Sequence, residues 1–158
     1  MKSLKRFVAL LVALVLLASV ASAEIYVYVL CNPSSWVNIH SKPSKRSETI
    51  AYAFTGDKLY SDCEYKNGYI HVIDLASETT EGWVSEAYIV YDEPTVYDDY
   101  EVFTVCVRGR VAVRKTVDGQ RSRWLKNGAK IKVYAISNEW AVTNYGFVMT
   151  EFLEAMGD

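Results

Sequence analysis

The sequence has few of the residues that usually hold a metal ion. It contains two histidines and three cysteines in 158 residues, and no C-x-x-C or H-x-x-x-H spacing occurs. Zinc sites usually draw several such side chains from short, regular spacings. We therefore expect neither a metal site nor a cofactor.

Helical periodicity is lacking outside residues 1–23. The chain instead contains short runs rich in Val, Ile and Tyr, which favour strands, and Gly, Asn, Asp and Ser interrupt them. Examples are "EIYVYVL", "YIHVIDL", "VFTVCV" and "KIKVYAI". These runs predict an all-β protein built as a small sandwich or barrel.

Residues 1–23 contain the one long apolar run. Three basic residues among the first six precede "FVALLVALVLLASV", and the small-x-small motif Ala21-Ser22-Ala23 follows it. This order predicts a secretory signal peptide that is cleaved before Glu24. The alternative is an uncleaved anchor, although the run is shorter than the roughly 20 residues that span a bilayer. We expect a secreted, extracellular or cell-wall-associated protein that meets the membrane only during export.

An excess of positive charge is lacking as well. Without residues 1–23, 14 of the 17 basic residues remain against 19 acidic ones, a net charge of −5. This balance argues against nucleic acid as a partner. The charge is unevenly distributed, because residues 24–90 carry a net −4, residues 91–101 carry five acidic groups and no basic one, and residues 102–154 carry a net +5.

Two stretches of the chain repeat one order of short motifs. Four motifs match in sequence: Val37-Asn38-Ile39-His40 with Val111-Ala112-Val113-Arg114, Gly56-Asp57-Lys58-Leu59 with Gly128-Ala129-Lys130-Ile131, Tyr69-Ile70-His71-Val72 with Trp140-Ala141-Val142, and Gly82-Trp83-Val84 with Gly146-Phe147-Val148. Since Trp and Phe exchange in the last motif, we interpret Trp83 and Phe147 as core residues that close each unit.

The order of these motifs resembles the bacterial SH3-like domain family. The match covers residues 27–90 and, more weakly, residues 102–154. The resemblance implies two small SH3-like barrels in tandem after the signal peptide: domain 1 over 24–90, an acidic linker over 91–101, and a divergent domain 2 over 102–158. This chain departs from the family where His40-Ser41-Lys42-Pro43 replaces Arg-Ser-Gly-Pro, and where Ala112 and Phe147 replace the usual Asn and Trp.

An enzymatic activity is not expected, although domains of this family often accompany cysteine peptidases of the cell wall. A cysteine nucleophile needs a histidine within hydrogen-bond reach and a third group that orients it. Here the three cysteines lie inside strand-like runs, and the two units use up the chain. The pairing of the cysteines stays open among a Cys31–Cys63 bond, a Cys31–Cys106 bond and free thiols.

Two groups of side chains are candidates for ligand binding. Aromatic rings in the first unit can stack on sugars or peptides, and an arginine row in "RGRVAVR" can bind phosphate or carboxylate. The candidate residues are Trp36, His40, Tyr52, Tyr69, Arg108, Arg110 and Arg114. The alternatives are that the aromatic residues pack in the core, and that the arginines form a solvated face or dock the acidic linker or first unit.

The expected function is that of a non-catalytic, exported binding module. The resemblance implies recognition of cell-wall peptidoglycan or its peptides. The alternative is an extracellular protein–protein interaction module that binds a partner enzyme or a surface protein.

Overall fold

The computed structural model describes residues 25–74 and 81–156. The predicted signal peptide lies outside these residues. The described chain consists of strands and two short 3-10 turns, η1 (Glu86–Tyr88) and η2 (Thr150–Phe152). Within the described ranges, no helix has both the length and the apolar character needed to cross a membrane.

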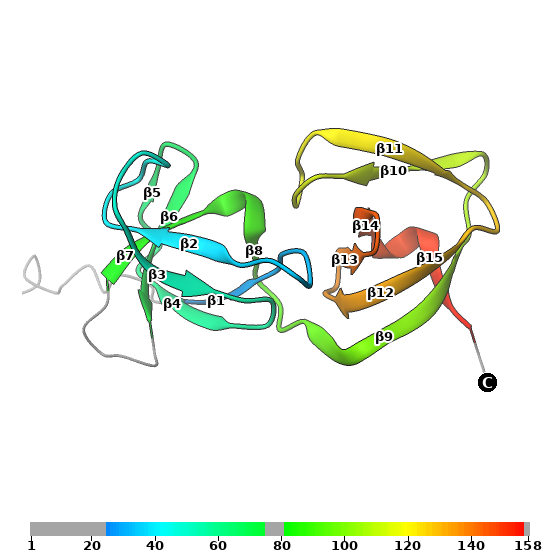
Figure 1. The fold of residues 1–158 in the computed structure, drawn as a ribbon, viewed down its shortest axis with the longest axis horizontal. Coiled ribbons are helices and arrows are strands. Elements are labelled where there is room, and N and C mark those ends of the chain that lie inside the picture. Colours follow the sequence, from blue (N-terminus) through cyan, green and yellow to red (C-terminus); the bar gives the residue numbers. More distant parts are fainter. Residues whose placement is uncertain (1–24, 75–80, 157–158) are drawn as a thin grey trace, which may run out of the picture.

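The first sheet has eight antiparallel strands (Figure 1). These are β1 (Ile25–Val29), β2 (Val37–His40), β3 (Thr49–Ala53), β4 (Lys58–Ser61), β5 (Tyr65–Lys66), β6 (Tyr69–Asp74), β7 (Glu81–Ser85) and β8 (Ile89–Val90). Their order is β3-β2-β7-β6-β4-β1-β8, and β5 pairs with β6 beside this path.

The second sheet has seven antiparallel strands in a matching order. These are β9 (Thr95–Val105), β10 (Arg110–Arg114), β11 (Arg121–Lys126), β12 (Lys130–Ile136), β13 (Trp140–Thr143), β14 (Gly146–Met149) and β15 (Leu153–Ala155). Their order is β11-β10-β14-β13-β12-β9-β15, which places one counterpart at every position of the first path.

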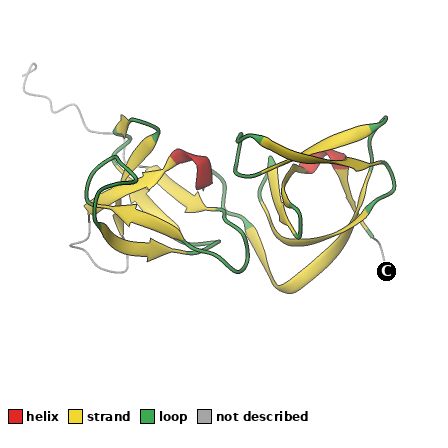
Figure 2. Ribbon diagram, turned by 45° about the horizontal axis from the view of Figure 1, so that its top comes forward, coloured by secondary structure: helices red, strands yellow, loops and turns green. Residues whose placement is uncertain are grey.

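The strand register confirms the sequence repeat at the level of single residues. His40 lies opposite Trp83 in the first sheet, and Arg114 lies opposite Phe147 in the second. A register shift comes just before His40 and again just before Arg114. Each sheet also has its 3-10 turn immediately before the last strand, as Figure 2 shows in red. The two halves therefore repeat one folding plan.

The prediction of an all-β chain with two small β domains is confirmed. Closure into barrels is not seen in the part of the chain that the structure describes. The path of hydrogen-bonded strands ends at β3 and β8 in one sheet and at β11 and β15 in the other. We refer to residues 25–90 as domain 1 and to residues 95–156 as domain 2.

Most of the predicted acidic linker, residues 91–101, belongs to a strand of domain 2. Strand β9 begins at Thr95, which lies opposite Ile136 of β12. Glu101 of β9 faces Val133 of β12, but Val96 faces Ala135, so residues 97–100 form a bulge within the strand. On either side of this bulge β9 pairs with β12, and its last three residues also pair with β15. Only residues 91–94 lie between the two sheets.

Each sheet curves around its own apolar core. The core of domain 1 contains Val27, Ile39, Ile70 and Val84, and that of domain 2 contains their counterparts Phe103, Val113, Ala141 and Val148. All eight side chains are buried. The alternation of side chains along a strand puts the residues between them on the outer face.

The interpretation of Trp83 and Phe147 as core residues needs correction. The flanking valines, Val84 and Val148, enter the two cores. Because neighbours along a strand point to opposite faces, both aromatic rings lie on the outer face of their sheet. Trp83 is only half-buried there, whereas Phe147 is fully buried.

Phe147 is buried because domain 1 covers the outer face of domain 2. An apolar cluster joins Tyr28, Leu30 and Val90 of domain 1 to Ala135, Trp140, Val142 and Phe147 of domain 2. Each of these side chains is at most 8% exposed. Two hydrogen bonds flank the cluster: Val117 N–H donates to the Ala87 carbonyl (3.0 Å), and Asn138 N–H donates to Asp92 Oδ2 (2.6 Å). The domains are therefore docked over an apolar interface with hydrogen bonds beside it.

We expect Phe147→Ala to destabilise the protein far more than Trp83→Ala at the equivalent position. Truncating a buried Phe costs about 3–5 kcal/mol, while the half-exposed Trp83 should cost about 1–2 kcal/mol. Urea unfolding followed by circular dichroism measures both. Equal losses would contradict the account in which domain docking buries Phe147.

Candidate binding cleft between the domains

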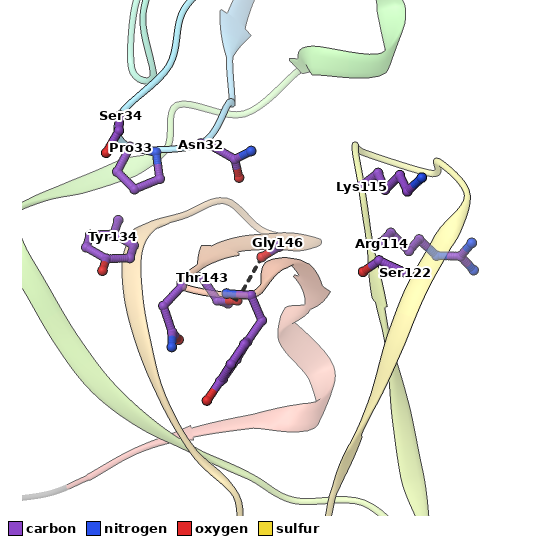
Figure 3. Close-up of a pocket in the computed structure, with 11 residues that line it drawn as sticks. Asn32, Pro33, Ser34, Arg114, Lys115, Ser122, Tyr134, Thr143 and Gly146 are labelled. Atoms are coloured by element: carbon purple, nitrogen blue, oxygen red, sulfur yellow. Dashed lines mark hydrogen bonds between the residues drawn. The ribbon is translucent and has the colours of Figure 1, made fainter.

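A cleft of about 480 Å³ opens where domain 1 meets domain 2 (Figure 3). One wall is the loop of residues 32–34 in domain 1. The remaining lining residues come from β10, β11, β12 and the β13–β14 turn of domain 2: Arg114, Lys115, Ser122, Tyr134, Thr143, Asn144, Tyr145 and Gly146. Neither domain forms this cleft alone.

The β13–β14 turn forms part of the lining because of a glycine and a threonine. Gly146 has φ +127°, a conformation that side chains rarely adopt, and a Cβ there would lie 2.5 Å from the Arg114 carbonyl oxygen. Glycine therefore lets β14 pass close to the end of β10. Thr143 Oγ1 donates to the Gly146 carbonyl (2.8 Å) and accepts from Tyr145 N–H (3.1 Å), which fixes the turn.

Basic side chains lie along one side of the cleft. Lys115 is exposed, and the Arg123 guanidinium lies 5.0 Å from the ring centre of Tyr145, which lines the cleft. Arg114 is half-buried, and its Nη1 donates to the Gly119 carbonyl (2.8 Å). In Figure 3 the Arg114 side chain extends away from Thr143 and Gly146. Lys115 lines the cleft as an exposed cation at its rim, and Arg123 adjoins the cleft only through Tyr145.

A second, acidic hollow of about 220 Å³ adjoins the first. It shares Asn32, Pro33 and Tyr134 with the cleft and is also lined by Asp98 and Asp99. Both aspartates are exposed and belong to the bulge in β9. The two adjoining hollows, one lined by cations and the other by carboxylates, share Tyr134. We call the two hollows together the interdomain groove.

Trp36 and Tyr52 are brought together at the surface of domain 1. Their side chains are 55% and 59% exposed, and their rings meet edge to face with centroids 5.9 Å apart. Trp36 follows the loop that forms the cleft wall, and Tyr52 projects from β3. For these two residues the alternative of core packing is excluded by their exposure.

His40 and Tyr69 lie elsewhere, on the outer face of β2, β7 and β6. His40 is buried and Tyr69 is half-buried, with ring centroids 6.0 Å apart. His40 Nδ1 donates to the Ser47 carbonyl (3.2 Å). Trp83 stands between His40 and His71 in the strand register. These two predicted residues therefore belong to a separate surface of domain 1.

The predicted arginine row does not form one continuous ladder. Arg108 precedes β10 and is separated from it by Gly109 at φ +100°, and the register shifts between Val113 and Arg114. Arg108 and Arg110 are exposed and do not line the groove, whereas Arg114 does. A turn and a bulge change the direction of side chains that strict alternation would align.

Sequence reasoning missed Asn32, Tyr134, Tyr145 and the aspartates as parts of one surface. Strict alternation puts Tyr134 on the polar face of its strand, but nothing in the motif order shows that this face meets domain 1. The one indication in the sequence was indirect. The acidic residues 91–101 lie directly before the basic residues 102–154, which suggests that the two charges meet in the fold.

The pKa values of two thiols are raised. Burial raises the pKa of the Cys31 thiol even though Thr55 hydrogen-bonds it, and a hydrogen bond with Glu154 raises the pKa of the Cys106 thiol. A catalytic cysteine needs the opposite shift. The cysteines at 31, 63 and 106 are joined by no disulfide in the described structure.

Comparisons with known proteins find only distant similarity. No protein-family model matches the chain, and no curated protein matches it. Among solved structures, it is similar to NlpC1 from Trichomonas vaginalis (12% identity, TM-score 0.38, 88% of this chain and 48% of that one). It is also similar to NlpC2 from the same organism (10% identity, TM-score 0.37, 85% and 49%). The chain spans about half the length of each, and similarity this low does not place it in a family.

We expect Glu154→Gln to speed the alkylation of Cys106. The Glu154 carboxylate holds the Cys106 pKa above its usual value, so neutralising it raises the fraction of reactive thiolate at a given pH. Iodoacetamide labelling at about pH 8, near the usual thiol pKa, followed by peptide mass spectrometry, gives the rate for each cysteine. Glu151→Gln, at a neighbouring exposed carboxylate, is the matched control, and equal rates in the two variants would contradict this contact.

Proposed function

We propose that the protein is a non-catalytic, exported binding module of the bacterial SH3-like type, and that its interdomain groove binds a peptide of the cell-wall peptidoglycan. The observation that carries this proposal is the groove itself, with cations at one end, carboxylates at the other and a tyrosine between them. A ligand with opposite charges at its two ends matches that pattern.

Stem peptides of peptidoglycan have this chemistry, because they combine free carboxylates with a free or cross-linked amine. Lys115 at the rim of the cleft can pair with a carboxylate, and such charge-assisted hydrogen bonds are stronger than neutral ones. Asp98 and Asp99 offer acceptors for an ammonium group. The volume of the cleft lies within the usual range for small-ligand sites, about 300–1,000 Å³.

The Trp36–Tyr52 pair supplies a second contact for the same polymer. Exposed aromatic rings stack on sugar faces and bury a large apolar area for few lost degrees of freedom. Since Trp36 follows the loop that lines the groove, a glycan strand can engage the pair while its peptide occupies the groove.

The alternative is an extracellular module that binds a protein partner. The exposed aromatic residues of domain 1 favour it, because Trp36, Tyr52 and Phe54 are each more than half exposed. Aromatic residues are enriched at protein interfaces. Phe54 also lines the acidic hollow, whereas Lys115 lies at the basic end away from these aromatic residues, so a variant at the basic end separates the two.

We expect Lys115→Glu to weaken co-sedimentation with purified peptidoglycan by about tenfold or more. A hydrogen bond to a charged group is worth about 1.5–3 kcal/mol, and about 1.4 kcal/mol corresponds to tenfold in affinity. Arg108→Glu, which makes the same change of charge outside the groove, is the matched control and should bind nearly as the parent does. Equal losses in both variants would point to nonspecific charge attraction, and wild-type protein that never sediments with peptidoglycan would refute the proposal.

Acetylating the amine of the peptide tests the acidic end of the groove. Calorimetry with a soluble stem peptide should give lower affinity when the peptide amine is acetylated. Asp98→Asn with Asp99→Asn should remove that preference for the free amine, because no carboxylate then remains to pair with it. A preference that survives the double substitution would show that the amine is recognised elsewhere.

We expect Trp36→Ala to reduce binding to intact peptidoglycan while leaving binding of the soluble peptide unchanged. The stacking contact involves only the glycan strand, so the loss should be confined to the polymer. The same sedimentation and calorimetry measurements decide this. If both affinities fall together, Trp36 contacts the peptide or supports the groove wall instead.

A further inference from the structure

A cluster of three potential metal ligands lies in domain 1, beside Trp83 and outside the interdomain groove. Asp62 and Glu64 follow β4, and His71 projects from the outer face of β6. One ligand atom from each side chain lies within 4.8 Å of the others. We propose that Asp62, Glu64 and His71 bind a divalent transition-metal ion of the Zn²⁺ type.

Hydrogen bonds hold the three residues in place. His71 Nδ1 lies 2.9 Å from Asp62 Oδ2, and Asp62 Oδ1 accepts from Glu64 N–H (3.1 Å). The Glu64 carbonyl in turn accepts from His71 N–H (2.9 Å). These contacts hold the side chains of Asp62 and His71 and the backbone of Glu64 before any ion arrives, which lowers the cost of ordering the site.

The turn that carries the carboxylates is special to domain 1. Strand β4 ends at Ser61, and Cys63 adopts φ 63°, whereas β12 of domain 2 continues as a strand to Ile136. Ser61 Oγ donates to the His71 carbonyl (2.7 Å) and accepts from Cys63 N–H (3.0 Å). The hydroxyl thus ties the turn to β6.

Domain 2 shows that the fold does not need these side chains. Its register places Val142 at the position of His71, because both lie opposite the aromatic residue of the final motif. Val133 is the counterpart of Ser61. Tyr134 therefore takes the position of Asp62, and Ile136 takes the position of Glu64. The same fold therefore forms with no ligating atom at the position of His71, and the set in domain 1 requires another explanation.

The donor set selects a class of ion. One imidazole nitrogen and two carboxylates suit Zn²⁺ and its neighbours, while Ca²⁺ and Mg²⁺ prefer oxygen ligands alone. On binding, the ion takes the place of the proton between His71 Nδ1 and Asp62, and that proton passes to solvent. The His71 and Asp62 side chains are 16% and 33% exposed, so the site is accessible, and positions remain for water.

Trp83 provides an optical signal for this site. Its ring centre lies 5.0 Å from that of His71. A paramagnetic ion such as Ni²⁺ bound at the cluster should quench Trp83 fluorescence, and Trp83→Phe should remove that component. The readout does not depend on peptidoglycan, so this proposal and that for the groove can fail separately.

The decisive experiment is a calorimetric titration of the folded protein with Zn²⁺, in a Cys106→Ser background that removes a surface thiol. We expect one ion per chain. His71→Asn should weaken binding by at least about tenfold, the lower limit seen when even a supporting partner of a metal site is changed. His40→Asn, at the other histidine of the chain, should leave the affinity unchanged.

A second pair of variants tests the site in case His71→Asn loses binding only because it unfolds. Glu64 and Glu48 are both exposed carboxylates, so Glu64→Gln should weaken Zn²⁺ binding and Glu48→Gln should not. Absence of Zn²⁺ binding, equal affinity in the His71 and His40 variants, or Ca²⁺ binding as tight as Zn²⁺ would each overturn the proposal. Site-specific loss together with Ni²⁺ quenching of Trp83 would establish it.

Discussion

The burial of the outer face of domain 2 under domain 1 is the contact on which the rest of the arrangement depends. Leu30 and Val90 of domain 1 pack in one cluster with Trp140, Val142 and Phe147 of domain 2. All five side chains are almost fully removed from water. Apolar burial of this kind contributes about 25 cal/mol per Å² removed from water. Because the cluster joins the two domains, it also sets how the two walls of the groove face each other.

The same contact explains why the two similar units are not interchangeable. Each domain has an outer sheet face. Each domain also has a surface on its first and last strands that can pack against the outer face of another domain. In domain 1 the covering residues are Tyr28, Leu30 and Val90, and the register places Thr104, Cys106 and Glu154 at the corresponding positions of domain 2. A carboxylate at such a surface opposes dry packing. The outer face of domain 1, with His40, His71 and Trp83, is likewise more polar than its counterpart.

The sequence predicted the strands, the repeat and the two β domains because alternation and turn residues are local signals. The exposure of Trp36 and Tyr52 agrees with their choice as surface aromatic residues. The sequence did not predict that most of the acidic linker would form part of strand β9, because that depends on pairing with β12 and β15. The groove and the Asp62–Glu64–His71 cluster were also missed, because both join residues whose proximity is set by tertiary contacts.

The short connection between the sheets has a consequence for how the chain folds. Domain 1 is synthesised first, and domains generally fold in that order. Once folded, it presents Leu30 and Val90 as a finished template, while residues 91–94 keep the following strands close by. Domain 2 can then complete its outer face directly against that template. The burial of Trp140 and Phe147 therefore depends on a folded domain 1.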